Sequence, residues 1–563
     1  MALSEQEIVR REKLQKLREL GINPYPADLY PLDHTSKKVK SEFEEGKKVI
    51  VAGRLMSRRI QGNASFAELQ DSDGRIQVYF NRDEICTGED KTKYNTVYKK
   101  LLDIGDFIGI EGELFLTKVG EKTIKVKNFT LLSKTLKPLP LPKVDAEGNT
   151  HDEFNDPEMR YRQRYADLVV NPHVKEVFVK RTKLFNAMRK YFNDAGYFEV
   201  ETPVLQPIPG GAAARPFVTH HNSLDMPLYM RIANELYLKR LIVGGFDGVY
   251  EFSKNFRNEG MDRTHNPEFT AMEIYVAYKD YNWMMEFVEN LLEYCAVAVN
   301  GTSEATFGEH KINFKAPYKR VTMTDAIIEF TGFDITNKSE DEIRQAAKGM
   351  GIDVDETMGK GKLIDEIFGE KCEGNYIQPT YITDYPKEMS PLCKEHRTNP
   401  ELTERFELMV CGKEVANAYS ELNDPIDQRE RFEHQLKLAQ KGDDEATEFI
   451  DYDFLRALEY GMPPTSGLGI GMDRLIMFLT NQQSIQEVLF FPQMRPERKA
   501  IEMTEEEKAV LKILKANTPI DLNVLKSQSG LSNKKWDKTI KGLTKNKLAE
   551  VSKTEEGLFV SAV

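Results

Sequence analysis

Cysteine is scarce in this sequence and long apolar runs are missing, and each shortage excludes a class of protein. Five cysteines are spread widely over 563 residues without a CxxC pair, so neither a disulfide framework nor a zinc knuckle is indicated. No run of about 18 apolar residues could span a membrane. The charged N-terminus has no apolar stretch like that of a signal peptide. We therefore expect a soluble, unprocessed protein in the reducing cytoplasm.

The sequence also has no excess of positive charge. Its 78 basic and 90 acidic residues give a formal charge of −12, which argues against nucleic-acid binding over the whole surface but allows local basic faces. Hydrophobic residues make up 40% of the 563 residues. This is enough for packed globular domains, and the length exceeds what one core can serve. The sequence therefore predicts three or four domains.

Short strands separated by glycine-containing turns occupy residues 48 to 132, after a helical pattern that starts near Ser4 and stops at Gly21. Five such strands fit a small barrel of the OB type, a common binder of single-stranded nucleic acid. These barrels stack bases on aromatic rings and bond to base edges, so Phe66 and Gln77 on neighbouring strands are candidate base readers. Taken alone, Phe66 is better explained as a core residue. The proline-rich KPLPLPK that follows indicates a stiff linker.

Residues 250 to 276 contain two strand-like halves that place polar side chains on one face at a spacing of two. The pattern predicts an antiparallel pair, and the turn-rich GMDRTHNP between the halves would form a basic loop above its polar face. Such a face indicates a polyanionic substrate that also carries a cation. The alternative is the solvated outer face of an ordinary sheet. The residues on this face are Glu251, Ser253, Asn255, Arg257 and Glu259 in the first half and Phe269, Glu273 and Tyr275 in the second.

FRNEG and HNPEFTAMEIYVAY in this region resemble motif 2 of the class II aminoacyl-tRNA synthetases, most closely the lysyl enzymes of bacterial type. The match runs from about Glu5 to Pro496 and includes PGGAAARPF, ELYLKRLIVGGF, NAYSELNDP and GLGIGMDRL in the family's order. GLGIGMDRL resembles motif 3. The helical pattern from Val174 to Ala195 resembles motif 1, on which class II enzymes dimerise. The resemblance implies an α+β fold, with an N-terminal OB-fold barrel and a catalytic antiparallel sheet flanked by helices, in a homodimer.

The resemblance also divides the chain into domains. The expected parts are an N-terminal helix and lead-in (1–47), an anticodon-binding OB fold (48–136), a linker (137–172), the catalytic domain (173–500) with a helical insertion (335–375), and a C-terminal extension (501–563). Three helical patterns and a terminal hairpin make the extension resemble a winged helix. Between Lys526 and Lys547 it has seven lysines and one acid, Asp537. It is an accessory tRNA-binding module, a protein-docking domain or an inert appendage.

The implied reaction joins the carboxylate of L-lysine to the α-phosphate of ATP and then transfers the lysyl group to the 3'-terminal adenosine of tRNA(Lys). Such a reaction requires two anions held in line and neutralised. A guanidinium fork suits both, so Arg257 is expected to bridge them. Phe269 and Arg474 would enclose adenine, and the catalytic residues implied are Arg257 and Arg474. The implied ATP-binding residues are Arg257, Glu259, Arg263, His265, Asn266, Phe269 and Arg474.

The choice of lysine would follow from charge. Glu235, Glu273 and Glu421 could meet the two ammonium groups of lysine, because leaving a buried ion unpaired costs several kcal/mol. Aspartyl and asparaginyl relatives would need Arg or Lys where this chain has Glu421 and Tyr275. The implied lysine-binding residues are Gly211, Glu235, Glu273, Tyr275, Asn417, Tyr419 and Glu421, with Arg215 and Arg231 nearer the entrance.

Glu407 and Glu414 resemble the family's magnesium ligands, which would join Mg²⁺ to phosphate oxygens. Strand parity raises a difficulty, because a two-residue turn at 412–413 places both glutamates on one face. Asn417, Tyr419 and Glu421 would then lie on the other face. A single pocket requires a β-bulge or a different turn.

In the barrel, the resemblance assigns the lysine anticodon to Arg54, Phe66, Glu68, Gln77 and Glu121. Two other functions remain open: a lysine-activating enzyme that modifies a protein, and a non-catalytic RNA-binding relative. The barrel counts against the first, because such enzymes usually lack it. The presence of Arg257, Glu273 and Arg474 counts against the second.

Overall fold

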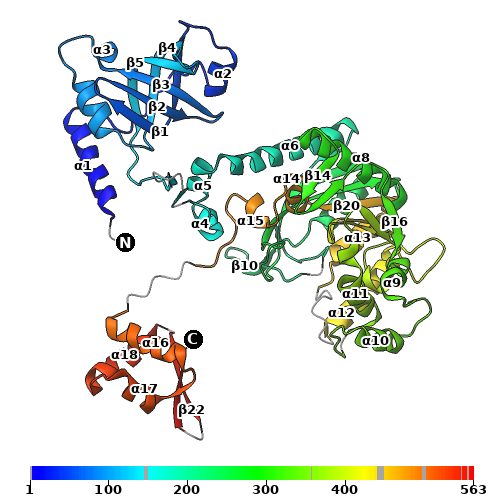
Figure 1. Cartoon of the computed structure of the whole chain (residues 1–563). Helices are drawn as coiled ribbons and strands as arrows, with labels where there is room; N and C mark the ends of the chain where they lie inside the picture. The colour runs from blue at the N-terminus through cyan, green and yellow to red at the C-terminus, as the bar shows by residue number, and fades with distance from the viewer. Residues whose placement is uncertain are drawn as a thin grey trace. The chain divides into compact units, whose positions relative to one another are not determined.

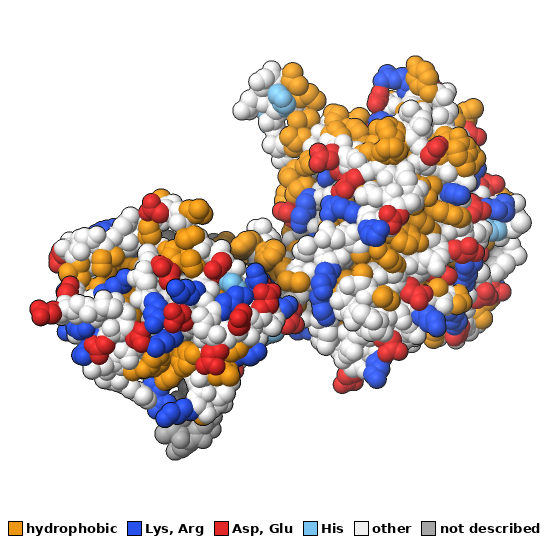
Figure 2. Space-filling view, turned by 90° about the horizontal axis from the view of Figure 1, so that it is seen from above, with side chains coloured by type: hydrophobic (Ala, Val, Ile, Leu, Met, Phe, Trp, Pro, Cys, Tyr) orange, Lys and Arg blue, Asp and Glu red, His pale blue; other side chains and the backbone are white. Residues whose placement is uncertain are grey.

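The computed structural model describes residues 3–144, 150–151, 153–212, 214–356, 358–440, 449–496, 503–546, 548–554 and 557–562. The chain forms two compact units, Met1–Pro492 and Gln493–Val563, and the second is coloured orange to red in Figure 1. Acidic and basic side chains are interspersed over the face drawn in Figure 2. Among the described residues, no helix has both the length and the apolar character needed to cross a membrane.

A closed five-stranded barrel lies near the N-terminus and confirms the expected OB architecture. Its strands are hydrogen-bonded in the order β1-β2-β3-β5-β4. Alternate residues of β2 and β3 are buried, so each strand gives one face to the barrel core. The elements are α1 (Glu5–Glu19), α2 (Ser36–Ser41), β1 (Lys48–Gln61), β2 (Ala64–Gln70), β3 (Arg75–Asn81), α3 (Arg82–Ile85), the π-helix Lys93–Leu101, β4 (Phe107–Leu116) and β5 (Lys122–Ser133).

The segment expected as a linker ends in two helices, and the second of them is bonded to the segment around residue 486. After the short strands β6 (Lys143–Val144) and β7 (Thr150–His151), the chain forms α4 (Pro157–Arg162) and α5 (Arg164–Val170). Arg164 is fully buried and donates to Asp167 at 2.6 Å and to the carbonyl of Gln486 at 2.7 Å. A buried guanidinium bonded in this way fixes α5 to the segment around residue 486.

An eight-stranded sheet forms the centre of the part that is expected to be catalytic, in the order β16-β17-β18-β19-β20-β13-β12-β8. Helices α6, α8 and α14 share one apolar core with it, which includes Leu184, Leu291, Ile476 and Ile274. The strands are β8 (Phe198–Glu199), β12 (Gly248–Phe256), β13 (Glu268–Ala277), β16 (Lys319–Thr322), β17 (Thr380–Thr383), β18 (Arg405–Val410), β19 (Lys413–Ser420) and β20 (Thr465–Gly471), and the helices are α6 (Pro172–Asp194), α8 (Tyr281–Asn300) and α14 (Met472–Thr480).

A β-bulge interrupts the β18–β19 hairpin and is one of the two solutions expected from strand parity. Val410 lies opposite Lys413, so the turn is formed by residues 411–412 and not by the expected 412–413. Glu407 lies opposite Asn417 and Leu408 opposite Ala416, but Met409 lies opposite Glu414, so the register shifts by one residue at Val415. Val415 and Ala416 are consecutive and both buried. The extra residue brings side chains before and after it to the same face of the sheet.

Smaller elements surround the sheet. Helices α10 (Glu340–Gly349) and α11 (Lys360–Lys371) lie where the helical insertion is expected, and with α9 (Met323–Thr331) they contribute Ile343, Leu363 and Ile327 to a core of their own. The remaining elements are β9 (Leu205–Gln206), β10 (Val218–His221), β11 (Met226–Met230), α7 (Glu235–Val243), β14 (Glu304–Phe307), β15 (His310–Asn313), the 3₁₀ turns Glu373–Asn375 and Lys387–Met389, α12 (Pro425–Gln440), α13 (Tyr452–Glu459) and α15 (Ile485–Val488).

The C-terminal unit consists of three helices and a small sheet, in the expected order. They are α16 (Glu505–Ala516), β21 (Ile520–Asp521), α17 (Leu522–Ser529), α18 (Asn533–Lys545), β22 (Ala549–Thr554) and β23 (Gly557–Ala562). Strand β21 pairs with β23 and converts the hairpin into a three-stranded sheet. Trp536, Leu514 and Val560 belong to one core of this unit. The unit therefore has a hydrophobic core separate from those of residues 1–492.

Candidate active site

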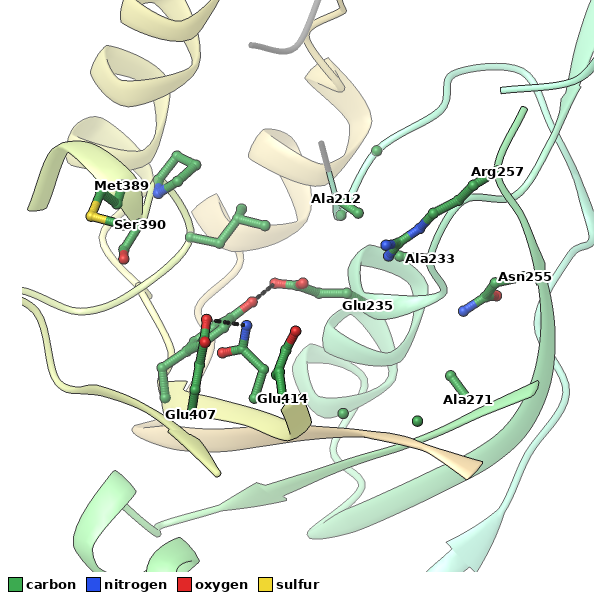
Figure 3. A pocket seen from close by; sticks show the side chains of 18 of the residues that line it. Ala212, Ala233, Glu235, Asn255, Arg257, Ala271, Met389, Ser390, Glu407 and Glu414 are labelled. Carbon is green, nitrogen blue, oxygen red and sulfur yellow. Dashed lines mark hydrogen bonds between the residues drawn. The ribbon is translucent and has the colours of Figure 1, made fainter. Parts of the chain in front are cut away.

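A cavity of about 990 Å³ opens on the polar face of the large sheet. Residues of β12, β13, β18, β19 and β20 form its floor, and α7 and the insertion contribute to its walls. Figure 3 shows Arg257 entering from one side and Glu407 and Glu414 standing on the other, with Glu235 between them. Cationic and anionic groups thus face the same space, as the sequence predicts.

Strands β12 and β13 form the expected antiparallel pair, with Glu251 opposite Glu273 and Asn255 opposite Phe269. Not all of their polar residues serve the cavity. Glu251 is buried and accepts from Arg231 at 2.7 Å and from Asn234 at 2.9 Å. Arg231 is itself buried and does not line the cavity. The expectation that Arg231 lies at the entrance is therefore wrong: the pair is structural, because each ion compensates the other's burial.

Arg257 follows β12 directly, and its guanidinium carbon lies 5.1 Å from the centre of the Phe269 ring. Arg474 lies in the first turn of α14 and donates to the backbone carbonyl of Glu414. Arg257, Phe269 and Arg474 all line the cavity. The residue before Arg474 anchors this wall, because Asp473 accepts from the Thr270 backbone N–H at 2.7 Å and pairs with Arg181 of α6 at 2.7 Å.

The loop between β12 and β13 contributes unevenly to the cavity. Glu259, His265 and Asn266 line it, whereas Arg263 is exposed and outside the lining. Glu259 accepts from the backbone N–H of Arg215 at 3.2 Å, and the Asn266 amide donates to the Glu268 carbonyl at 2.6 Å. His265 is held by Asp262 at 2.8 Å. The assignments of Arg263 and His265 to the outer phosphates stay predictions.

Six of the seven expected lysine-binding residues line the cavity: Gly211, Glu235, Glu273, Tyr275, Asn417 and Tyr419. The Tyr419 hydroxyl donates to Glu235 at 2.8 Å, and the Tyr275 hydroxyl donates to Glu273 at 3.1 Å. Burial, and then the negative charge of Glu235, raise the pKa of Glu273 to about 8. Glu273 thus holds a proton at neutral pH until a cation enters beside it.

Glu421, the seventh residue, lies behind the cavity wall at Gly467. A Cβ on Gly467 would stand only 2.1 Å from Glu421 Oε1, so the absence of a side chain there makes room for the carboxylate. Oε1 is buried without a hydrogen-bond partner in the described part of the chain. An unsatisfied buried carboxylate oxygen is costly, and a cation from the cavity would satisfy it.

Lys239 of α7 is a site residue that sequence reasoning missed. It is fully buried, with Nζ 2.5 Å from Glu235 Oε1, and it also pairs with Glu421. Although burial lowers it, the charges of Glu235 and Glu421 raise the pKa of Lys239 above its usual value. Its spacing of four from Glu235 resembles an ordinary surface ion pair of a helix, so only the burial of α7 reveals it.

Lys239 reduces the negative charge of the pocket to a value that a free lysine can balance. Three glutamates and one lysine give a formal charge of −2 when all are ionised, from Glu235, Glu273, Glu421 and Lys239. The two ammonium groups of a free lysine would neutralise that charge, provided that an arginine binds the carboxylate of the lysine. A guest with one ammonium group would leave a buried negative charge without a partner.

Glu407 and Glu414 suit a magnesium ion. Glu407 accepts from Arg405 at 2.5 Å and from the Asn417 amide at 3.5 Å. Burial, and then the charge of Glu414, raise the pKa of Glu407 to about 7, which indicates two carboxylates close together without a sufficient counter-ion. No cluster of three or more His, Cys, Asp or Glu ligands occurs in the described ranges. Two carboxylates leave further positions for phosphate oxygens and water, which Mg²⁺ prefers.

The expected anticodon residues gather on the outer face of the barrel. Glu68 lies opposite Gln77, and Phe66 is half-buried outside the barrel core, with its ring 5.0 Å from that of Tyr79. Tyr79 lies 5.9 Å from Phe115, so three rings form a row. Sequence reasoning missed Tyr79 and Phe115, although both alternate with buried residues.

The other two expected anticodon residues lie at the ends of this face. Glu121 is exposed in the turn before β5, and its carbonyl accepts from Thr123, which also donates to Gln77 at 2.8 Å. Arg54 donates to the Gly105 carbonyl at 2.9 Å and lies 4.2 Å from the Phe107 ring centre. The anticodon assignments stay predictions.

Comparisons with known proteins agree with this geometry. Residues 156–495 match the model of the tRNA synthetases class II (D, K and N), and residues 49–132 match the OB-fold nucleic acid binding domain. A lysine–tRNA ligase of Christiangramia forsetii is 80% identical over 99% of this chain and 98% of its own length. The chain belongs to the class II lysine–tRNA ligases.

Two further lysine–tRNA ligases differ in how much of this chain they cover. One from Porphyromonas gingivalis is 66% identical over 92% of this chain and 90% of its own length. One from Azobacteroides pseudotrichonymphae is 64% identical over 88% of this chain and 99% of its own length. Part of the present chain therefore has no counterpart in that second ligase. The matched family models also leave residues 496–563 outside.

A methyl group at Gly467 tests the cavity wall beside Glu421 in this ligase. The added Cβ would lie 2.1 Å from Glu421 Oε1 and 2.4 Å from Tyr275 Cε1, whereas a Cβ at Gly469 would meet Glu273 Cγ at an ordinary 3.8 Å. We expect Gly467→Ala to lower the free energy of unfolding by about 1–3 kcal/mol and Gly469→Ala to leave it nearly unchanged, as measured by urea denaturation. Equal stability of the two variants would contradict the packing described here.

Glu273 predicts a pH dependence of stability in the lysine-free protein. Its pKa is raised to about 8 from 4.5, so between these values the folded state holds a proton that the unfolded state has lost. Stability therefore falls as pH rises through this window, by at most about 1.4 kcal/mol per pH unit. We expect Glu273→Gln to lose less thermal stability than the unmodified protein between pH 5.5 and 8.5.

Glu404→Gln provides the matched control. Glu404 is also buried, but outside the cavity lining. Although burial raises it, hydrogen bonds from Arg397 and then Ser420 lower the pKa of Glu404, so it stays ionised over this range in both states. The Tm difference between Glu404→Gln and the unmodified protein should stay constant from pH 5.5 to 8.5. Parallel Tm curves for Glu273→Gln and the unmodified protein would refute the assignment of a bound proton to Glu273.

Proposed function

We infer that this protein is a lysine–tRNA ligase, which forms lysyl-adenylate and pyrophosphate from L-lysine and ATP and then transfers the lysyl group to the 3'-terminal adenosine of tRNA(Lys). One observation carries the choice of amino acid. The three glutamates of the pocket exceed its lysine by two negative charges, next to the cavity-lining Arg257. A dibasic amino acid with a free carboxylate fits this arrangement, whereas aspartate or asparagine would leave buried carboxylates unpaired.

The mechanism depends on holding and neutralising two anions. Arg257 would bridge the lysine carboxylate and the α-phosphate of ATP, because its guanidinium offers several donors in one plane. Phe269 and Arg474 would hold adenine, and Glu259 and Asn266 would bind the nucleotide beside them. These side chains bring the attacking oxygen and the phosphorus together, and no covalent bond to the protein is needed.

Magnesium would be held by Glu407 and Glu414, whose mutual repulsion a divalent cation removes. When bound, Mg²⁺ supplies positive charge to the phosphate oxygens. Asn417 and Arg405 contact Glu407 at 3.5 and 2.5 Å, and they orient its carboxylate. The bulge at Val415 puts Glu407 and Glu414 on the same face of the sheet as Asn417. Strand β19 therefore contributes to both the phosphate-binding and the lysine-binding part of the cavity.

A homodimer with motif 1 at its interface accords with the surface of residues 172–199. Val179 on α6 is 46% exposed, and Phe198 on the edge strand β8 is 58% exposed and packs against Phe246 at 5.7 Å between ring centres. An uncovered sheet edge flanked by apolar side chains is a site for pairing with another chain. We propose that a second copy covers it.

Amino-acid-dependent exchange of pyrophosphate into ATP tests the activity. Each of the twenty amino acids is offered in turn, and lysine alone is expected to support exchange because only it supplies two ammonium groups of the right reach. Purified tRNA(Lys) should then accept labelled lysine. Exchange without charging would instead favour an enzyme that modifies a protein, and neither reaction would favour a non-catalytic RNA-binding relative.

Glu421→Gln separates lysine recognition from nucleotide binding. The change removes a buried negative charge and the ion-pair partner of Lys239, so the lysine KM should rise by about tenfold or more, as expected when a charge-assisted hydrogen bond is removed. The ATP KM should stay within about twofold. Glu404→Gln, which removes a buried carboxylate outside the cavity, should change neither KM. An equal loss for lysine and ATP would show that Glu421 acts only through the fold.

A further inference from the structure

Helix α18 of the C-terminal unit carries four lysines in one straight row. Lys534, Lys538, Lys541 and Lys545 follow one another at intervals of four, three and four residues. At 3.6 residues per turn these intervals return to the same side of a helix. We call these four residues the lysine row.

The opposite side of α18 is anchored in the core of the unit. Trp536, Thr539 and Leu543 are buried there, and by helical angle they lie on the side away from the row. All four lysines of the row are exposed. The core therefore fixes the helix so that the row faces solvent.

The row has little negative charge to neutralise it. Within the described ranges, none of its four lysines takes part in an ion pair, whereas the neighbouring Lys535 is paired with Glu506 of α16 at 2.8 Å. Asp537 is the one acid of α18 and stands to the side of the row. Four ammonium groups in a line, none within ion-pair distance of an acid in the described ranges, make a local positive field on a protein of net charge −12.

We propose that the lysine row binds the phosphate backbone of tRNA. The inference rests on the proposed function, since tRNA is the polyanion that a lysine–tRNA ligase must bind. Steps of three or four residues space the lysines about 4.5–6 Å apart along the helix axis, which suits the repeated charge of a nucleic-acid strand. Flexible ammonium groups contact phosphates without selecting a base.

Other partners fit the row less well. A protein partner requires an apolar or aromatic anchor at the centre of the contact, and the row contains none, because Trp536 and Leu543 are buried. A helix lying on a membrane requires an exposed apolar side, and the apolar side of α18 faces its own core. A row that offers charge without an apolar anchor therefore favours a nucleic acid over a protein partner or a membrane.

The lysine row would add tRNA affinity to a ligase whose other parts carry out the reaction. The relative from Azobacteroides pseudotrichonymphae is covered over 99% of its length by 88% of this chain, so it lacks some of the present residues. Neither matched family model reaches the C-terminal unit beyond residue 495. A second contact on a tethered module raises the effective concentration of tRNA without altering the active site.

The test compares two variants of the full chain in which all four lysines become either Gln or Arg. We expect the Gln variant to bind tRNA(Lys) about tenfold more weakly at low salt. Its plot of log affinity against log salt should be shallower by about one for each phosphate that the variant no longer neutralises. The Arg variant keeps the charge and should bind like the unmodified protein. Lysine-dependent pyrophosphate exchange should be unchanged in both.

Each outcome supports or overturns the proposal. Unchanged affinity and salt dependence of the Gln variant would overturn it, and so would an equal loss in the Arg variant, which would indicate damage to the module. The double variant Lys538→Gln/Lys541→Gln, with half the charge loss, should show an intermediate slope. Binding of vesicles containing anionic lipid that the Gln variant loses, while tRNA affinity stays unchanged, would assign the row to a membrane surface and overturn the proposal.

The same measurements separate this proposal from the proposed function. If the unmodified protein shows no lysine-dependent exchange, the proposed function fails whatever the row does. If exchange and charging are normal but the Gln variant binds tRNA with full affinity, only the row's role fails.

Discussion

The ion pairs of Lys239 with Glu235 and Glu421 are the interaction on which the character of the cavity depends. Burial raises the pKa of the Glu421 carboxyl well above its usual value, and the positive charge of the fully buried Lys239, which pairs with both carboxylates, opposes that rise. Lys239 also joins α7, which supplies Glu235, to the chain just after β19, which supplies Glu421. Three carboxyl groups therefore share one buried cation before the guest arrives, and a further cation can be paired within the pocket.

The rest of the cavity is arranged around this anionic centre by backbone features. Gly467 leaves space for Glu421 and Tyr275 where any side chain would collide with them. Asp473 links the end of β20 to β13 and to α6 through the Thr270 backbone N–H and Arg181. The residues that resemble motifs 1, 2 and 3 of the family are thus held together by one buried carboxylate. Opposite charges can face each other at fixed separation because this frame is rigid.

Much of the fold and of the site could be predicted because strand parity and charge carry the information. The alternation in residues 250–276 predicted the antiparallel pair β12 and β13, and the parity conflict between Glu407 and Asn417 predicted a bulge or a different turn, of which the structure has the bulge. Parity could not distinguish structural from functional acids. Glu251 lies on the same face as the site residues, but its carboxylate accepts hydrogen bonds from Arg231 and Asn234 and is not available to a ligand. Lys239 was missed because spacing along a helix does not reveal which side the rest of the protein covers.

The bulge at Val415 also restricts how this hairpin can vary in related sequences. One residue gained or lost between Leu408 and Asn417 would turn Glu414 away from Glu407, or Asn417 and Tyr419 into the apolar core, since side chains alternate along a strand. Changes of length in this hairpin should therefore be rare among functional relatives, and should come in pairs when they occur. Insertions have a permitted place in the helical segment 335–375, away from its residues that line the cavity, because α10 and α11 have a core of their own.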